Sequence, residues 1–160
     1  MLRKSTIKYV SLAALVWAGA TSVASAGYER QVLGEAGRAV SSSNASCLSL
    51  SYGSIKNTCA STVSVDIPLP LDDDYYSHTR TFYLSGSWSG ATLPSSCQIV
   101  SLDAGFKTVY NHYFNIPGGG QFLQDTSLNT PGGGVVYLNC KMPQNFVINY
   151  VSFDPGNNGA

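Results

Sequence analysis

The sequence has few charged residues and very little histidine. Among its 160 residues are 9 lysines and arginines, 9 aspartates and glutamates, and 2 histidines. No basic stripe occurs, which argues against nucleic acid as a partner, because clustered lysine and arginine bind the phosphate backbone. A hydrolytic triad places a histidine between a serine and an acid, whereas His78 and His112 lie among polar and aromatic residues. We therefore expect surface histidines, no catalytic residues and no enzymatic activity.

Motifs for metals and cofactors are also missing. No C-x-x-C pair with a nearby histidine occurs, so a zinc site is not expected. The glycine triplets at 118–120 and 132–134 do not lead into Lys-Ser/Thr, so they are not phosphate-binding loops. Asp72, Asp73 and Asp74 offer oxygens to calcium but lack the alternating spacing of an EF-hand, which favours a solvated turn. No cofactor is predicted.

The one long apolar run lies at the N-terminus. Three basic residues among the first eight precede an apolar stretch at 10–20, which is too short to span a bilayer. Ala24, Ser25 and Ala26 then form an A-x-A cleavage site. Residues 1–26 are therefore predicted to be a secretory signal peptide, and the protein to be extracellular or periplasmic. Its removal leaves 6 basic against 9 acidic residues, with no further apolar run that could span a membrane.

Four cysteines follow the predicted signal, at Cys47, Cys59, Cys97 and Cys140. An even number in a secreted chain indicates two disulfides, and four cysteines allow three connectivities. We favour Cys47–Cys59 and Cys97–Cys140.

The second of these bonds would join two predicted strands. Residues 97–102 begin with a cysteine and residues 135–140 end with one, and both stretches are apolar and rich in β-branched residues. Antiparallel pairing of the two cysteines places Ile99 beside Leu138 on one face. The predicted distance between the cysteine Cα atoms is about 4.4–6.8 Å.

About eight short strands are predicted, with turn signals between them and almost no helical pattern. The fold class is therefore all-β, an antiparallel β-sandwich or more specifically a jelly roll. Residues 47–153 form the single domain, residues 27–46 a flexible N-terminal arm, and residues 154–160 a polar tail. Two loops are expected, at 70–77 and at 86–96. The remaining strands are expected at 48–52, 63–69, 79–85, 108–116 and 145–153, and after each glycine triplet.

Four short motifs are YGSIKN at 52–57, VSVDIPLP at 63–70, VYLNCKMP at 136–143 and NYV at 149–151. Together they resemble a family of small secreted bacterial β-sandwich proteins of uncharacterised function. The family tends to carry a cysteine before the proline of its second strand; here Ile67 holds that place, and Cys59 takes over the partner role. The resemblance covers roughly residues 47–153, and it implies a secreted β-sandwich without catalytic residues.

Aromatic side chains are the candidate binding residues, because a planar ring can stack on a sugar ring. Only Tyr75, Tyr76 and Trp88 fall in predicted loops, where binding residues concentrate; other tyrosines are expected on half-buried strands. We predict a non-enzymatic binding module for glycans or another surface ligand. The alternative is a structural or surface-associated protein that assembles through an edge strand or through its N-terminal arm.

Overall fold

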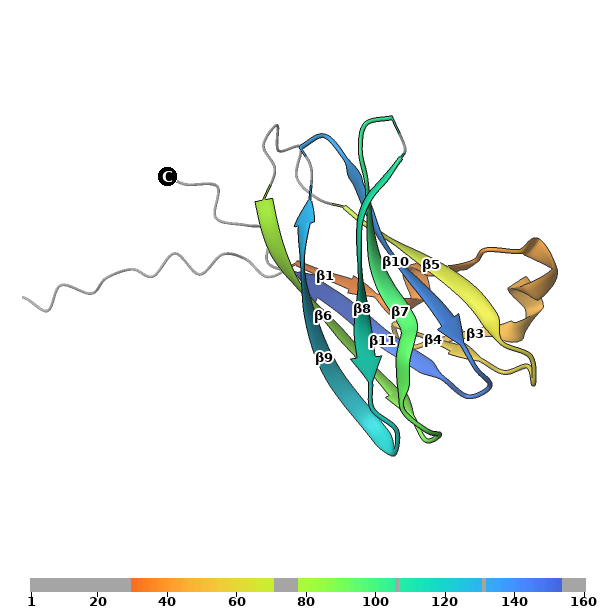
Figure 1. The fold of residues 1–160 in the computed structure, drawn as a ribbon. Helices are drawn as coiled ribbons and strands as arrows, with labels where there is room; N and C mark the ends of the chain where they lie inside the picture. Colours follow the sequence, from red (N-terminus) through yellow and green to blue (C-terminus); the bar gives the residue numbers. More distant parts are fainter. Residues whose placement is uncertain (1–29, 71–77, 106, 131, 154–160) are drawn as a thin grey trace, which may run out of the picture.

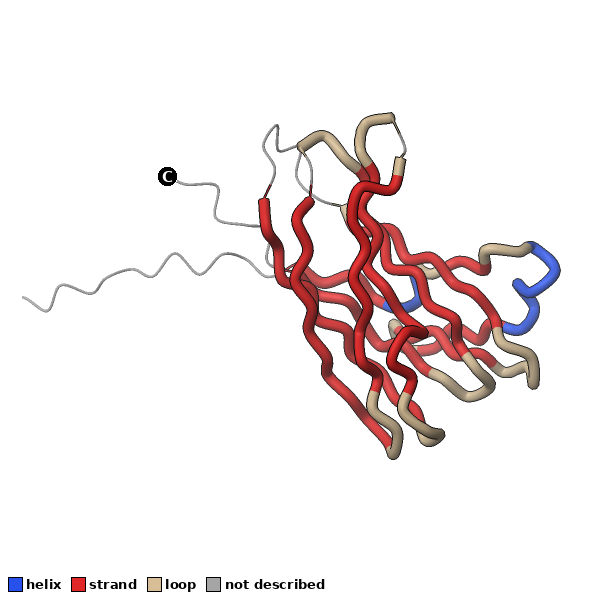
Figure 2. The backbone as a smooth tube through the Cα atoms, in the orientation of Figure 1, coloured by secondary structure: helices blue, strands red, loops and turns tan. Residues whose placement is uncertain are grey.

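The computed structural model describes residues 30–70, 78–105, 107–130 and 132–153, and within them two antiparallel sheets pack face to face. The strands form two layers, with the short helices beside them (Figures 1 and 2). The predicted β-sandwich is confirmed, with eleven described strands instead of about eight. The first sheet has the order β3 (Leu48–Ser51), β4 (Ser54–Asn57), β11 (Val147–Phe153), β6 (His78–Trp88) and β9 (Gly120–Thr130), with β1 (Arg30–Leu33) also paired to β11. The second has the order β2 (Arg38–Ala39), β5 (Val63–Leu69), β10 (Val135–Met142), β7 (Leu93–Leu102) and β8 (Thr108–Ile116).

The core lies between the sheets and follows the alternation of the strands. In β5 and β10 every second side chain is buried, as expected for strands with one face on a core. Phe82 and Phe153 face each other across neighbouring strands, with ring centroids 5.9 Å apart. Burial of each large side chain contributes roughly 1.5–3 kcal/mol. The largest fully buried side chains include Phe82, Phe114, Phe146, Phe153, Ile55, Ile67, Leu138 and Met142.

Strand β10 is the centre of the second sheet, between β5 and β7. The predicted register of β10 with β7 is confirmed, because Cys97 pairs with Cys140 and Ile99 with Leu138. The two cysteines form a disulfide whose Cα atoms are 4.1 Å apart, below the predicted range. The cysteines are directly opposed, and the Cα atoms of the closer kind of antiparallel pair are about 4.5 Å apart.

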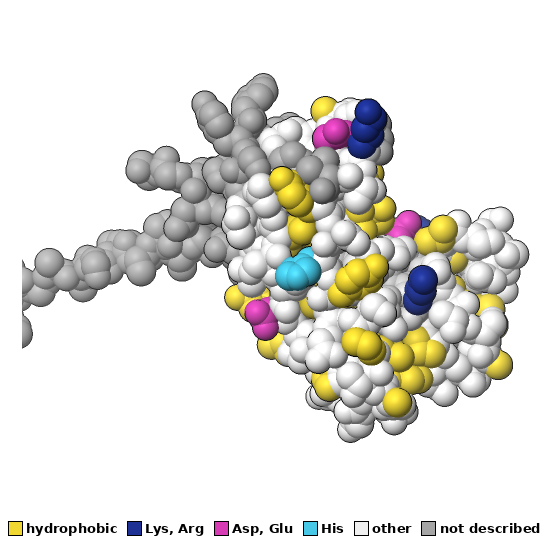
Figure 3. Space-filling view, viewed as in Figure 1, with side chains coloured by type: hydrophobic (Ala, Val, Ile, Leu, Met, Phe, Trp, Pro, Cys, Tyr) yellow, Lys and Arg dark blue, Asp and Glu magenta, His cyan; other side chains and the backbone are white. Residues whose placement is uncertain are grey.

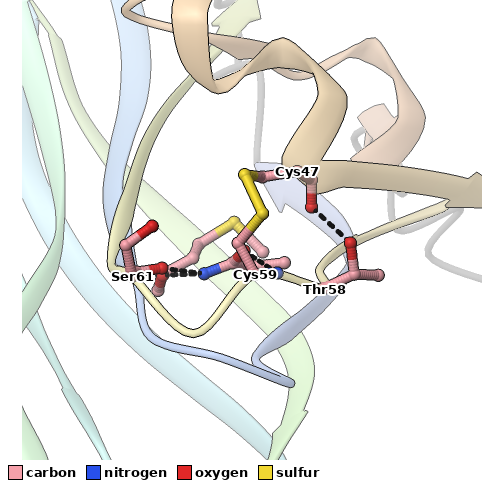
Figure 4. Close-up of a disulfide and its surroundings, with 6 residues drawn as sticks. Cys47, Thr58, Cys59 and Ser61 are labelled. Atoms are coloured by element: carbon pink, nitrogen blue, oxygen red, sulfur yellow. Dashed lines mark hydrogen bonds between the residues drawn. A yellow bond between two sulfur atoms is a disulfide. The ribbon is translucent and has the colours of Figure 1, made fainter.

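The other disulfide, Cys47–Cys59, closes the β3–β4 hairpin, with its Cα atoms 5.1 Å apart (Figure 4). The turn has positive φ at both Tyr52 (49°) and Gly53 (83°), the geometry of a two-residue type I′ turn. This register places Thr58, and not Cys59, opposite Cys47. The Thr58 amide and hydroxyl both donate to the Cys47 carbonyl, at 2.8 and 2.9 Å. The disulfide therefore reaches one residue beyond the directly opposed position.

The predicted flexible N-terminal arm is wrong from Arg30 onward. Strand β1 pairs with β11 of the first sheet and β2 pairs with β5 of the second, so this segment joins both layers. Helix η1 (Gly34–Ala36) connects the two strands, and helix η2 (Ser42–Cys47) follows. A Cβ on Gly34 would collide with the Ile148 carbonyl, and one on Gly37 would lie 2.9 Å from Val65 Cγ1. Because Gly34 and Gly37 lack a Cβ, they allow the segment to dock closely on both sheets.

The predicted loop at 86–96 is also wrong in extent, because β6 continues to Trp88 and β7 begins at Leu93. Gly86, the first residue of the expected loop, lies within β6 opposite Phe122. A Cβ there would collide with the Val147 carbonyl and lie 2.7 Å from Phe122 Cζ, so the glycine allows β11 and a buried ring to approach closely. Three predicted segments lie outside the described residues: the signal at 1–26, most of the loop at 70–77, and the tail at 154–160. The part of the loop that is not described, residues 71–77, includes the three aspartates. None of the described helices is long and apolar enough to cross a membrane.

Candidate functional site

The outward face of the second sheet carries amide, carboxylate and tyrosyl groups on neighbouring strands. Because Val65, Cys97 and Cys140 point into the core, the alternate residues of β5, β7 and β10 point outward. The strand registers then place these outward residues side by side across the sheet. In the view of Figure 3, charged side chains are sparse and apolar patches are small and separate.

One row crosses all five strands of this sheet. The register pairs Arg38 with Asp66, Asp66 with Asn139, Asn139 with Gln98, and Gln98 with Tyr113. Neighbouring strands are about 4.8 Å apart, so the row is about 19 Å long. We call it the polar row. Tyr113 at its end is 47% exposed, so its ring is open to a ligand.

Two hydrogen bonds hold amides of this face in place. Asn139 Nδ2 donates to Asp66 Oδ1 at 2.7 Å, and Asn111 Nδ2 donates to Gln98 Oε1 at 3.1 Å. Each amide has two N–H donors and one carbonyl acceptor. One internal bond therefore orients the group and leaves capacity for hydrogen bonds to a ligand.

A second row, beside the polar row, supplies apolar surface. Pro68 pairs with Tyr137, Tyr137 with Val100, and Val100 with Asn111. Val100 is only 4% exposed although it points outward, so its neighbours cover it. Burial raises the pKa of Tyr137, and the negative charge of Asp66 raises that pKa further. The Tyr137 hydroxyl therefore keeps its proton and can donate.

This arrangement suits a ligand with many hydroxyl groups and weakly polar C–H surfaces. Carboxylate and amide groups match hydroxyls, and tyrosine presents an apolar ring with a polar tip. Such sites fix a ligand with a few placed polar groups beside apolar surface. The face can bind and orient a sugar, and no chemical step follows from it.

Trp88 lies at the end of β6 and not in a loop. Its ring packs on Phe146, with centroids 6.0 Å apart, and its Nε1 donates to the Ala91 carbonyl at 2.7 Å. Gly90 lies so close that a Cβ on it would collide with the indole ring. These contacts explain Trp88 as a half-buried packing residue at the edge of the core.

Tyr75 and Tyr76 lie outside the described residues, and their role stays a prediction. They precede His78, which begins β6, whereas Trp88 ends that eleven-residue strand. The two ends of β6 are about 33 Å apart at 3.3 Å per residue. Tyr75 and Tyr76 thus precede one end of β6 in the sequence, and Trp88 is at its other end.

The polar row could not be predicted from loop position, because its residues come from strands. The available signal was alternation: Tyr137, Asn139 and Lys141 occupy alternate positions in a strand whose intervening side chains are apolar. Their neighbours Gln98 and Asp66 belong to strands far away in the sequence. Only the register between strands shows that they are adjacent.

His112 is exposed and lies where the edges of the two sheets approach each other. Its Nδ1 is 2.9 Å from the Ser127 carbonyl oxygen and 2.8 Å from Thr126 Oγ1. The expected surface histidine is thus also a link between β8 and β9.

The side chain of the other histidine, His78, lies outside the described part of the chain. Within the described ranges no group of three His, Cys, Asp or Glu residues is placed to hold a metal ion.

Two grooves flank the N-terminal segment on the side of the molecule away from β8 and β9. The larger, about 700 Å³ in volume, lies between the β1–η1–β2 segment and β3, with residues such as Leu33, Glu35, Arg38, Leu48 and Leu50 on its walls. The smaller, about 520 Å³, is lined by Val32, Ala36, residues 68–70 and residues 134–136. Both are mainly apolar.

No family model matches the sequence, and no curated protein matches it. Among solved structures, "BiXyn10A CBM1 APO" is similar over 80% of this chain and 96% of its own, with a TM-score of 0.51 and 11% identity. A family 35 carbohydrate binding module from Clostridium thermocellum covers 78% and 96%, with a TM-score of 0.49 and 10% identity. The C-terminal CBM6 of LamC from Zobellia galactanivorans covers 79% and 98%, with a TM-score of 0.46 and 12% identity. At these identities the likeness shows the β-sandwich fold alone.

Proposed function

We propose that this chain is a secreted, non-enzymatic β-sandwich that binds a glycan on the outward face of its second sheet. The observation that carries the proposal is the polar row, in which amides and a carboxylate form a continuous band that ends in an exposed tyrosine. The internal bond of Asn139 to Asp66 holds its amide in a fixed orientation before a ligand arrives. Such preorganisation reduces the entropy cost of binding.

The chemistry of the face favours an uncharged sugar. Arg38 and Asp66 lie opposite each other at one end of the row, so their opposite charges offset each other and the row carries no net charge. The middle of the row consists of amides, which bind hydroxyls as donor and acceptor at once. Solved structures with this fold include proteins named as carbohydrate binding modules. Their likeness is in the fold, so the residues of the face are the argument.

Secretion belongs to the same proposal. Two disulfides are compatible with an oxidising compartment, and the signal predicted at 1–26 would deliver the chain there.

A glycan array with the mature protein, followed by calorimetry on the best ligand, tests the proposal. Tyr137→Ala and Asn139→Ala should each weaken binding at least tenfold, because one removes apolar contact and the other a hydrogen-bonding amide. Tyr52→Ala is the matched control, since this fully exposed tyrosine lies at the hairpin turn of the other sheet. The Tyr52→Ala variant should bind the glycan with the same affinity as the wild type.

Two outcomes would contradict the site. If no glycan binds, the proposed function fails. If a glycan binds with equal affinity to the wild type and to both face variants, the site lies elsewhere. A Tyr75→Ala/Tyr76→Ala double variant then tests the pair predicted from sequence.

A further inference from the structure

Strand β3 is an edge of the first sheet whose outer side has no strand partner among the described residues. Ser51 and Ser54 flank the two-residue turn, and Leu50 pairs with Ile55 next to them. Hydrogen-bonded and non-hydrogen-bonded pairs alternate from such a turn. The N–H and C=O groups of Leu50 therefore point away from β4, toward the free side.

The contacts of Asn57 support this alternation. Asn57 is opposite Leu48, and its backbone N–H and C=O bond to Phe146 and Asn145 on its other side, at 3.1 and 2.7 Å. The Leu48–Asn57 pair is thus non-hydrogen-bonded, two residues from Leu50–Ile55. The Leu48 N–H is already bonded to the Ala45 carbonyl. Leu50 consequently presents the unused donor of this edge.

Leu50 also faces the inside of the sandwich without being covered. It shares a face with Ile55, which is fully buried, yet 53% of Leu50 is exposed. The second sheet ends with β2, which has two residues, and so does not extend over β3. The uncovered space is the groove of about 700 Å³, with Leu48, Leu50 and Leu33 on its walls. Exposed edge strands of this kind are normally blocked or paired.

We propose that β3 pairs antiparallel with β3 of a second copy of this chain, forming a two-fold dimer whose first sheets become continuous. An antiparallel pair around a two-fold axis is self-complementary, so one patch supplies both sides of the interface. Leu48 and Leu50 of each copy then lie on the same face, and the groove is covered. The backbone groups of Leu50 gain partners in the same step.

The charges at the groove favour a second copy over an unrelated strand. Glu35 and Arg38 both line it, and the Arg38 guanidinium is held by the Glu35 and Gly37 carbonyls at 3.1 and 2.8 Å. Each groove thus presents one negatively charged and one positively charged side chain. Two copies joined edge to edge can pair Glu35 of one groove with Arg38 of the other, which avoids the repulsion of like charges. The dimer surface and the glycan face share Arg38, at the end of the polar row. The residues tested for glycan binding, Tyr137 and Asn139, lie on the outward face of β10, in the other sheet from β3.

Analytical ultracentrifugation of the mature protein between about 1 and 100 µM tests the dimer. The wild type should sediment as a dimer at the upper end of this range. Leu50→Lys should raise the dissociation constant at least tenfold, because an inward-pointing charge on an edge strand opposes pairing. Tyr52→Lys is the control: it adds the same charge two residues away on a fully exposed side chain, and should leave the dimer intact.

Amide hydrogen exchange gives a second readout that does not depend on a substitution. The Leu50 amide should exchange slowly in the dimer and at least tenfold faster after dilution, while the buried Ile55 amide changes little. A wild type that is monomeric at 100 µM would overturn the proposal. So would a Leu50→Lys variant that remains as dimeric as Tyr52→Lys, or a Leu50 amide whose exchange is independent of concentration.

Discussion

Asn57 shows how one residue joins three segments. It is fully buried, and its Nδ2 donates to the Ser61 and Met142 carbonyls, each at 2.8 Å. Its Oδ1 accepts from the Cys59 amide at 3.0 Å. The side chain therefore ties the hairpin that carries Cys59 to the end of β10, and it satisfies backbone groups that would otherwise be buried without partners.

We expect Asn57→Ala to destabilise the protein by about 3 kcal/mol, since each buried group left unpaired costs about 1–3 kcal/mol. Urea denaturation measures the difference. Asn111→Ala is the control, because that amide makes an exposed bond to Gln98, and it should change the free energy of unfolding by less than about 0.5 kcal/mol. Equal stabilities of the two variants would refute a structural role for Asn57.

Among the elements, β1 and β2 depend most on close packing. Gly34 is buried, and the nearest atoms to a Cβ there belong to the backbones of Ile148 and Ile55, which cannot move aside as a side chain can. Its neighbour Glu35 donates its amide to the Gly53 carbonyl at 3.1 Å. The segment thus contacts β11 and the hairpin turn together.

Gly34→Ala should destabilise the protein by about 1–3 kcal/mol, the usual cost of overpacking. It should also release β1, so that the Val32 and Leu33 amides exchange faster. Hydrogen exchange with mass spectrometry locates the effect. Gly105→Ala is the comparison, since its nearest neighbour is the Asp103 side chain. Unchanged protection of β1 in Gly34→Ala would show that this segment tolerates a methyl group.

For the whole molecule, the two disulfides restrain loops of different length. Cys97 and Cys140 are separated by 43 positions in sequence and Cys47 and Cys59 by 12. The chain-entropy estimate is about 4 kcal/mol for the longer loop and about 3 kcal/mol for the shorter. Cys97→Ala/Cys140→Ala should therefore cost more stability than Cys47→Ala/Cys59→Ala in urea denaturation. The reverse order would mean that native-state contacts, and not chain entropy, dominate.

Regular alternation within a strand was sufficient to locate most of the sandwich. Strand β5 has its predicted bounds, and β8 and β10 begin where predicted. The Cys97–Cys140 pair and the β7–β10 register also followed from the residues, because a cysteine at the start of one strand and another at the end of its partner permit one antiparallel alignment. The favoured Cys47–Cys59 pair is confirmed as well. These features are local or depend on one covalent bond.

The N-terminal strands and the candidate site were decided by tertiary structure. Strands β1 and β2 have four and two residues, too short for periodicity to reveal. They exist because residues 150–153 of β11 extend beyond its pairing with β4, and because β5 has a free side. The polar row combines Asp66, Gln98 and Asn139 from three strands. Each looks like an ordinary outward residue of its own strand, and only hydrogen-bonded register brings them together. Sequence therefore determined which face of each strand is buried, and packing between strands determined which outward residues become neighbours.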